Sequence, residues 1–281
     1  MKKKILLCVI AIIIVAIVYI VIALLPYKDE YFDESKMPNI VRNENAWYSK
    51  TNMIAHAGGI FNNLDHTNSK EAIESFLMST VDEEIRVVEL DFDYTSDNVL
   101  VCSHLYRDKG FKYVPTYEEY MSYDKDGFTP MDFNDVIKYM ENNSNLYIMV
   151  DTKVEQHTDK TIVDIASEMI NKIPDEYKDR LIFQLYYPKQ KEQMMKIYNF
   201  KEENLVLSLY KGYPLINDAL KDAYDYHFSV ILFNKKFFND DELQRLINKN
   251  FVLVVYTVNK QNEKDKLLDK GITVTITDNL Y

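Results

Sequence analysis

The chain has 281 residues, which is enough for one large folded domain, and a formal charge of −11. This acidity argues against a nucleic-acid partner, because phosphate backbones are bound by basic surfaces. The two cysteines, Cys8 and Cys102, exclude a disulfide framework in the main domain and a cysteine-based zinc site.

The N-terminus has the pattern of a membrane anchor. Three lysines, at positions 2–4, precede an uncharged run over residues 5–25, and about 20 apolar residues span a bilayer as a helix. The lysines precede the run and acidic residues follow it, and because positive residues stay inside, the positive-inside rule leaves the N-terminus in the cytoplasm. A cleaved signal peptide is the alternative, but residues 23–26 (Ala-Leu-Leu-Pro) form a poor cleavage site.

We therefore expect a single-pass cell-membrane protein whose catalytic domain is extracytoplasmic. Residues 1–26 are predicted to be the transmembrane signal-anchor and residues 27–50 a juxtamembrane linker. The linker is polar and aperiodic, and Trp47 and Tyr48 are expected to pack partly on the domain that occupies residues 51–281.

The domain begins with a short strand and a helix. Residues 53–55 are apolar and predict a strand that ends at His56. Asn68 is expected to begin a helix, with Glu71 completing a capping box three residues later.

Two strands then follow with no space for a helix between them. They are predicted over residues 86–92 and 99–102, with a turn at residues 96–98. A parallel pair needs a crossover connection, so this pair interrupts any regular strand–helix repeat.

The long stretch over residues 105–130 also breaks the repeat and contains seven aromatic residues: Tyr106, Phe111, Tyr113, Tyr117, Tyr120, Tyr123 and Phe128. It is either a lid over a substrate or ordinary aromatic packing.

The rest of the chain alternates between strand-like and helix-like segments. Strands are predicted over residues 146–150, 181–185, 205–209, 230–233, 251–255 and 272–276. Helices are predicted over residues 132–140, 161–173, 190–198, 215–223, 241–247 and 261–268. Strands this apolar predict a parallel sheet covered by helices. A distorted (β/α)8 TIM barrel after one N-terminal transmembrane helix is the leading fold, and an open doubly wound sheet is the alternative.

Six polar side chains lie at or near predicted strand ends: His56, Glu89, Asp91, His104, Asp151 and Lys153. In a barrel, the carboxyl ends of the strands meet at one mouth. Glu89 and Asp91 are two residues apart on a strand, so they face the same side and can converge on one cation. Histidines transfer protons near neutral pH, and this combination predicts a metal-assisted phosphodiesterase.

The order of these motifs resembles the glycerophosphodiester phosphodiesterase family, in the group that includes phosphatidylinositol-specific phospholipase C. The resemblance covers residues 53–281. The matching stretches are His56-Ala57-Gly58, Asn68-Ser69, Glu89-Leu90-Asp91, Thr95-Ser96-Asp97, His104, Asp151-Thr152-Lys153, Tyr256-Thr257-Val258-Asn259 and Ile276-Thr277-Asp278. The chain departs from the family pattern at Ala57, Thr67 and Leu105, where an arginine, an acid and an aspartate are usual, and at Asp151, which is usually glutamate.

The resemblance implies a role for each site residue. Glu89, Asp91 and Asp151 would hold one Ca²⁺ or Mg²⁺, because hard cations prefer oxygen ligands, and Lys153 would bind the phosphate. His56 is expected to act as general base and His104 as general acid. Two further loop histidines, His66 and His157, could each lie at the edge of the mouth, but both are interpreted as solvated loop residues and are left out of the predicted site.

The expected substrate is a phosphodiester: a glycerophosphodiester, a lipid head group or a glycerol-phosphate surface polymer. Two alternatives remain open. One is a phospholipase C- or D-like lyase that yields a cyclic phosphate, and the other is a tethered barrel that binds a glycopolymer without cleaving it.

Overall fold

The computed structural model describes residues 33–79, 84–124, 127–152, 158–210 and 215–279, and it divides the chain into compact units over residues 1–37 and 38–281. The described part of the first unit contains a single 3-10 turn, Glu34–Lys36. The predicted membrane anchor lies outside the described residues. Within the described ranges, no helix is both long and apolar enough to cross a bilayer.

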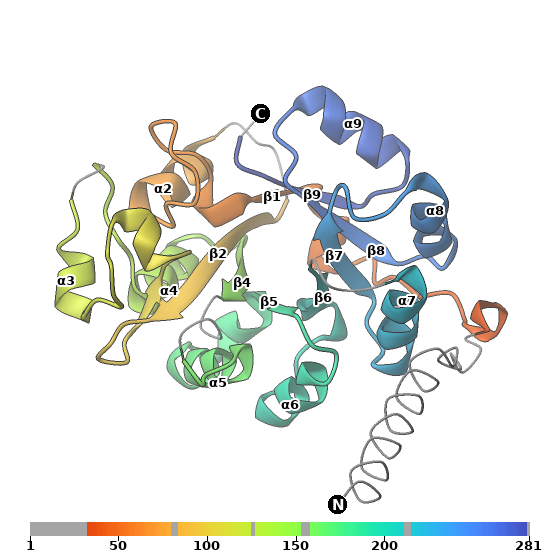
Figure 1. The fold of residues 1–281 in the computed structure, drawn as a ribbon, viewed down its shortest axis with the longest axis horizontal. Helices are drawn as coiled ribbons and strands as arrows, with labels where there is room; N and C mark the ends of the chain where they lie inside the picture. Colours follow the sequence, from red (N-terminus) through yellow and green to blue (C-terminus); the bar gives the residue numbers. More distant parts are fainter. Residues whose placement is uncertain (1–32, 80–83, 125–126, 153–157, 211–214, 280–281) are drawn as a thin grey trace, which may run out of the picture. The chain divides into compact units, whose positions relative to one another are not determined.

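Eight parallel strands close into a barrel in the second unit (Figure 1). They are β1 Met53–Ala55, β2 Arg86–Tyr94, β4 Leu146–Thr152, β5 Leu181–Leu185, β6 Leu205–Leu209, β7 Val230–Asn234, β8 Val252–Tyr256 and β9 Val274–Thr277. Each strand pairs with the next in this order, and β9 pairs with β1 to close the barrel. The closed sheet confirms the predicted TIM barrel and rules out the open doubly wound alternative.

A ninth strand, β3 (Leu100–Cys102), lies outside the closed ring and pairs antiparallel with the end of β2. The connecting turn is short: the Thr95 hydroxyl donates to the Asp97 carboxylate at 2.6 Å, and Asn98 has a φ of 63°. No crossover helix fits in such a connection, which confirms the predicted distortion of the barrel at this point.

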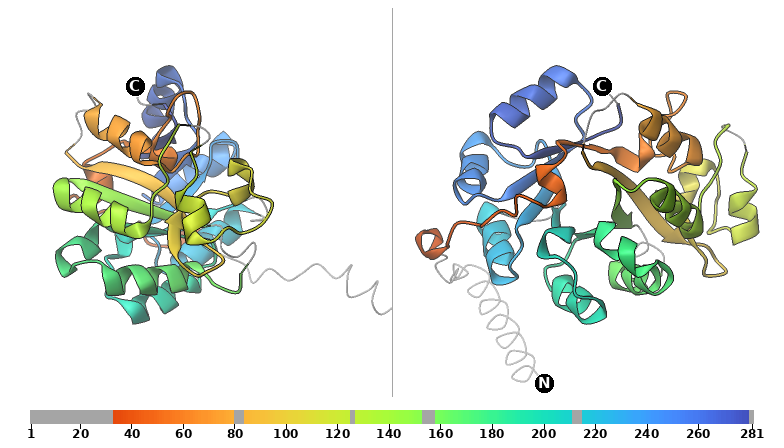
Figure 2. Two further views of the ribbon diagram at one scale, coloured as in Figure 1. Left: turned by 90° about the vertical axis from the view of Figure 1, so that its left-hand side faces the viewer. Right: turned by 180° about the vertical axis from the view of Figure 1, so that it is seen from behind.

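Helices lie around the outside of the barrel (Figure 2). They are α2 Lys70–Met78, α4 Phe133–Asn142, α5 Ile162–Lys172, α6 Gln190–Ile197, α7 Ile216–Asp225, α8 Asp240–Asn248 and α9 Gln261–Asp269. Apolar residues on their inner faces pack on strands that are already filled on the inside, so both faces of the sheet are buried.

The predicted capping box at the start of α2 is wrong. The N-cap is Ser69, whose hydroxyl accepts from the Ala72 N–H, so the helix begins one residue later than expected. Glu71 instead accepts hydrogen bonds from the backbone and hydroxyl of Thr129, in the segment before α4. The Asn68 side chain does not cap the helix, and it forms hydrogen bonds with Asp91 of β2.

The segment over residues 38–50 belongs to the same compact unit as the barrel. Ala46, Trp47 and Tyr48 are buried in one apolar cluster with the strand residues that fill the barrel interior. The Trp47 indole donates to the Glu203 carbonyl, which lies just before β6, so this segment covers the amino ends of the strands. Figure 2 shows it crossing the rear of the barrel in the right-hand view.

The aromatic stretch over residues 105–130 contains a 3-10 turn, Tyr106–Lys109, and a short helix, α3 (Tyr117–Met121). Its rings pack on β3 and on one another, and the Tyr120 hydroxyl donates to the Cys102 carbonyl at 2.5 Å. These contacts are those of ordinary aromatic packing, which is one of the two interpretations predicted for this stretch. None of these rings lines the pocket at the barrel mouth, as far as the structure describes it.

Candidate active site

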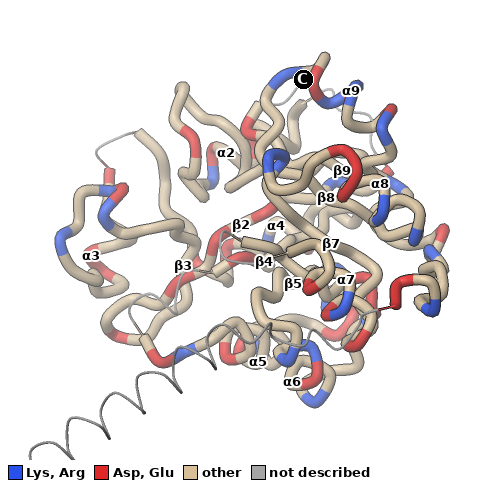
Figure 3. The backbone as a smooth tube through the Cα atoms, turned by 45° about the vertical axis from the view of Figure 1, so that its right-hand side comes forward, with Lys and Arg blue, Asp and Glu red and all other residues tan. Residues whose placement is uncertain are grey.

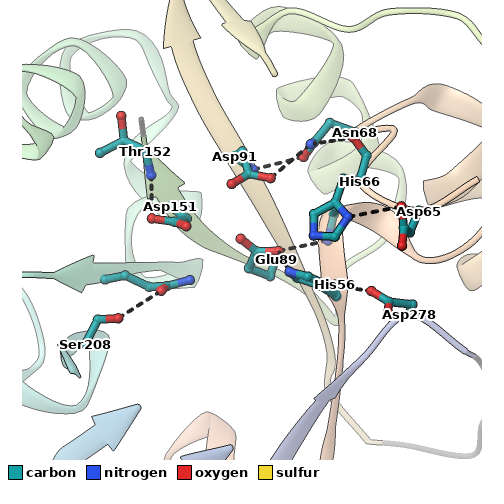
Figure 4. Close-up of polar contacts among 12 residues, drawn as sticks. His56, Asp65, His66, Asn68, Glu89, Asp91, Asp151, Thr152, Ser208 and Asp278 are labelled. Atoms are coloured by element: carbon teal, nitrogen blue, oxygen red, sulfur yellow. Dashed lines mark hydrogen bonds and ion pairs between the residues drawn. The ribbon is translucent and has the colours of Figure 1, made fainter. Parts of the chain in front are cut away.

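A pocket of about 220 Å³ opens at the carboxyl ends of the barrel strands. Five of the six predicted site residues line it: His56, Glu89, Asp91, His104 and Asp151. The sixth, Lys153, lies outside the described residues. Figure 4 shows how most of these side chains point toward the barrel centre from β1, β2 and β4.

Three buried carboxylates form the floor of this pocket. Asp91 and Asp151 are direct neighbours in the register of β2 and β4, and Glu89 lies two residues before Asp91 on the same face. One oxygen from each of the three carboxylates lies within 4.8 Å of the others. In Figure 3 the acidic positions of β2 and β4 lie beside one another, whereas most Lys and Arg positions are on surrounding helices and loops.

The three carboxylates repel one another at this separation, and His56 Nε2 lies 3.9 Å from Glu89. Burial raises the pKa of Glu89 to about 8, and the negative charge of the nearby Asp91 adds to the effect. Three carboxylate oxygens within reach of one another are a ligand set suited to a hard divalent cation such as Ca²⁺ or Mg²⁺. The residues present therefore fit the metal site predicted from the sequence.

Each carboxylate is held by a specific donor. The Ala57 N–H donates to Glu89 at 2.8 Å, and the Tyr186 hydroxyl donates to Asp151 at 2.5 Å. Asn68 makes two hydrogen bonds to Asp91. Its side-chain N–H donates to the carboxylate at 3.0 Å, and its side-chain oxygen accepts from the Asp91 backbone N–H at 2.9 Å. These contacts orient the oxygens before any cation arrives, as outer-shell partners do in metal sites.

The turn after β1 explains how the Ala57 N–H reaches Glu89. Ala57 and Gly58 have φ values of 48° and 88°, so the chain bends sharply at the strand end. A Cβ on Gly58 would lie 3.0 Å from the Ala72 Cβ, which leaves no space for a side chain where the turn packs on α2.

His56 is paired with an aspartate from the far end of the chain. Its Nδ1 lies 2.5 Å from Asp278 Oδ1, and Asn259 donates to the other Asp278 oxygen at 2.6 Å. Burial of His56 opposes its protonation, but the hydrogen bond to Asp278 and the charges of Glu89, Asp278 and Asp91 outweigh this and raise its pKa to about 9.

The second predicted histidine, His104, follows β3 and pairs through Nδ1 with Asp108 at 2.8 Å. A third ring, His66, lies against both predicted histidines, with centroid distances of 4.5 Å to His56 and 4.9 Å to His104. The interpretation of His66 as a solvated loop residue is therefore wrong, since it lines the pocket. His157 lies outside the described residues.

Four site contributors were not predicted as such: His66, Asn68, Tyr186 and Asp278. A signal existed for Asp278, because it follows the last barrel strand, which closes on the strand that carries His56. Asn68 lies in the Asn68-Ser69 motif, where the sequence pattern predicts only a helix cap. Tyr186 follows β5 and occurs in no motif, so the sequence held no signal for it.

The comparisons with known proteins agree with this geometry. The sequence model of the glycerophosphoryl diester phosphodiesterase family matches residues 65–281. No protein of curated function matches the chain at the sequence level.

Solved structures share the fold at low identity. A Thermotoga maritima glycerophosphodiester phosphodiesterase has a TM-score of 0.62 at 20% identity over 81% of this chain and 94% of its own. A Parabacteroides distasonis glycerophosphodiester phosphodiesterase has a TM-score of 0.63 at 17% identity, over 82% of this chain and 93% of its own. An Oleispira antarctica phosphodiesterase was solved with the product sn-glycerol-3-phosphate. It has a TM-score of 0.64 at 14% identity, over 82% of this chain and 94% of its own.

Proposed function

The chain belongs to the glycerophosphoryl diester phosphodiesterase family, and from that premise we propose that it hydrolyses glycerophosphodiester-type bonds with two histidines in general acid–base roles. The observation that carries this proposal is the meeting of two Asp–His pairs and three buried carboxylates in one pocket. That combination suits a phosphodiesterase, which must move protons at both alcohol oxygens and offset the charge that builds on the phosphoryl group.

Glu89, Asp91 and Asp151 would hold the divalent cation. When bound, Ca²⁺ or Mg²⁺ supplies charge neutralisation at the phosphoryl oxygens and lowers the pKa of an attacking hydroxyl. Asn68, Tyr186 and the Ala57 N–H keep the three carboxylates in position, and Lys153 is proposed to add a positive charge to the phosphate.

His56 is proposed as the general base. Asp278 accepts from Nδ1, which leaves Nε2 to face the pocket and receive a proton. Once the charges of Glu89 and Asp91 are neutralised, part of the cause of the raised His56 pKa is removed, so the ring can work as a base near neutral pH.

His104 is proposed as the general acid. Its ring is 26% exposed and lies at the open side of the pocket, where an alcohol can depart into solvent. Asp108 pairs with Nδ1 and orients the ring, and the leaving oxygen is proposed to take its proton from the opposite ring nitrogen.

The substrate source follows from the proposed location. Residues 1–26 carry the anchor pattern, so we propose a single-pass cell-membrane protein with its catalytic domain outside the cytoplasm. A tethered domain there meets lipid head groups and glycerol-phosphate surface polymers.

The test uses the full-length chain in detergent, with glycerophosphocholine and glycerophosphoglycerol as substrates and with Mg²⁺, Ca²⁺ or chelator. Phosphorus NMR follows the products, and an accumulating cyclic phosphate would identify a lyase in place of a hydrolase. His56→Asn and His104→Asn should each lose at least ~10²-fold in rate. His227→Asn is the matched control, since His227 is exposed and does not line the pocket. Equal rates in all three variants would contradict the proposal.

A further inference from the structure

The pocket contains one basic side chain for which the proposed mechanism has no use. We propose that His66 is a third functional histidine, which binds a non-bridging oxygen of the substrate phosphate through its Nε2. This inference rests on the proposed phosphodiesterase function and adds a substrate-binding residue to it.

His66 shares one feature with the two proposed proton-transfer histidines, which is an aspartate beside Nδ1. Hydrogen bonds join His56 to Asp278 at 2.5 Å and His104 to Asp108 at 2.8 Å, whereas the exposed neighbour Asp65 lies 3.3 Å from His66 Nδ1. With Asp65 on the Nδ1 side, the opposite Nε2 edge of the His66 ring is available to a ligand, and an Nε2–H group donates a hydrogen bond.

The His66 ring is positioned at the reacting centre. It meets His56 edge to face, with an interplanar angle of 79°, and it lies tilted against His104. Figure 4 shows one edge of the ring directed at Asp65 and the opposite edge directed toward Glu89 and His56. A phosphate that contacts both proton-transfer histidines would therefore lie beside His66.

The proposed proton transfers leave one histidine of the pocket without a role. Among the described lining residues, the basic side chains are His56, His66 and His104. Two of these exchange protons during the reaction, so His66 is the one that can keep a constant hydrogen bond to a phosphoryl oxygen, in addition to the cation and Lys153 proposed above.

The backbone of the loop determines where the ring lies. His66 has a φ of 53°, a left-handed conformation that is unfavourable for a residue with a Cβ. Asn68 helps to hold the loop, since its N–H donates to the Ala57 carbonyl at 3.1 Å.

The left-handed backbone also selects the variants for the test. Asparagine tolerates this conformation, so His66→Asn removes the ring with little additional strain. His66→Lys keeps a positive charge, and His227→Asn is a matched control at another position of positive φ, 56°.

The first measurement is steady-state kinetics of the full-length chain with saturating Mg²⁺ and glycerophosphocholine. His66→Asn should lower kcat/KM by about 10²-fold and raise the inhibition constant of inorganic phosphate by about tenfold. His66→Lys should recover at least tenfold of the lost kcat/KM, and the thermal unfolding midpoint should stay unchanged in both variants. Unchanged kcat/KM and phosphate inhibition in His66→Asn, or no recovery with lysine, would overturn the proposal.

A second measurement does not depend on turnover. The chain has five histidines, so their imidazole nitrogens can be assigned by long-range ¹H–¹⁵N NMR. Inorganic phosphate added to the Mg²⁺-loaded protein should shift the His66 Nε2 signal. A wild-type protein that shows this shift but hydrolyses no phosphodiester would contradict the proposed function alone. A protein that turns over substrate while the His66 signal stays still would contradict the His66 inference alone.

Discussion

Replacement of Asp278 by asparagine isolates the part that this residue plays in the site. The change keeps the shape of the side chain but removes its charge, and the new amide cannot accept from both His56 and Asn259 as the carboxylate does. His56 would then lose both the group that fixes its Nδ1 proton and its nearest negative charge.

The size of the effect follows from the His56 pKa. A rise from 6.5 to about 9 corresponds to about 3 kcal/mol in favour of the imidazolium, at about 1.4 kcal/mol per pKa unit. Asp278 contributes a hydrogen bond and a charge to this rise, so its removal should lower the pKa by at least about 1 unit. With the tautomer also released, we expect kcat/KM to fall by between about 10²- and 10⁴-fold.

The pH dependence of the free energy of unfolding provides a second test, which is made in cation-free protein. A raised His56 pKa stabilises the fold fully below pH 6.5, and this contribution is lost as the pH rises through about 9. Asp278→Asn should therefore destabilise the protein more at pH 6.5 than at pH 9.5, as measured by urea unfolding.

The assay compares the full-length variant with Asp225→Asn, a change in the exposed Lys221–Asp225 pair of α7. NMR titration of His56 in chelated protein gives the pKa directly. A variant with wild-type kcat/KM and an unchanged His56 pKa would refute the role assigned to Asp278.

Three further outcomes are expected. Mg²⁺ binding at pH 7 should release protons from Glu89 and His56, because burial and like charge raise the pKa of Glu89, the hydrogen bond to Asp278 and nearby carboxylates raise that of His56, and a bound cation favours loss of a proton from both; calorimetry in two buffers of different ionisation enthalpy measures the release, and zero release would contradict the raised pKa values. Asn68→Ala should weaken Mg²⁺ binding by about 10- to 100-fold through loss of the two contacts to Asp91, which the same calorimetry detects. Trp47→Ala should lower the free energy of unfolding by about 3–5 kcal/mol, because this 2% exposed ring fills the barrel end, and an unchanged urea midpoint would exclude that role.

Local sequence pattern predicted most of the barrel. The runs over residues 181–185 and 205–209 match β5 and β6 in both bounds, because a strand buried on both faces is apolar throughout. The predicted strand over residues 53–55 also matches β1. The remaining strands differ by one or two residues at an end, as where the polar residues Asp151 and Thr152 extend the ladder of β4 beyond its apolar part.

The candidate site was predictable where its residues share one strand or one strand end. Glu89 and Asp91 have the period of two that places them on one face, and both line the pocket. Contacts between distant loops were not predictable in this way. His66 reaches the pocket through a left-handed loop conformation that the side-chain pattern does not encode, and Asp278 meets His56 across 222 positions of sequence.

The segment that covers the amino ends of the barrel strands has a consequence for the order of events during biosynthesis. Its contacts are with late parts of the chain: Arg42 donates to the Asn250 carbonyl at 3.0 Å, the Ile40 N–H donates to the Lys249 carbonyl at 2.8 Å, and Trp47 donates to the Glu203 carbonyl. Since a ribosome delivers the N-terminus first, Trp47 leaves it about 150 residues before its partner exists. The segment over residues 38–50 therefore cannot complete its native contacts until residues 249 and 250 have been synthesised, and its aromatic side chains can meet non-native partners in the meantime.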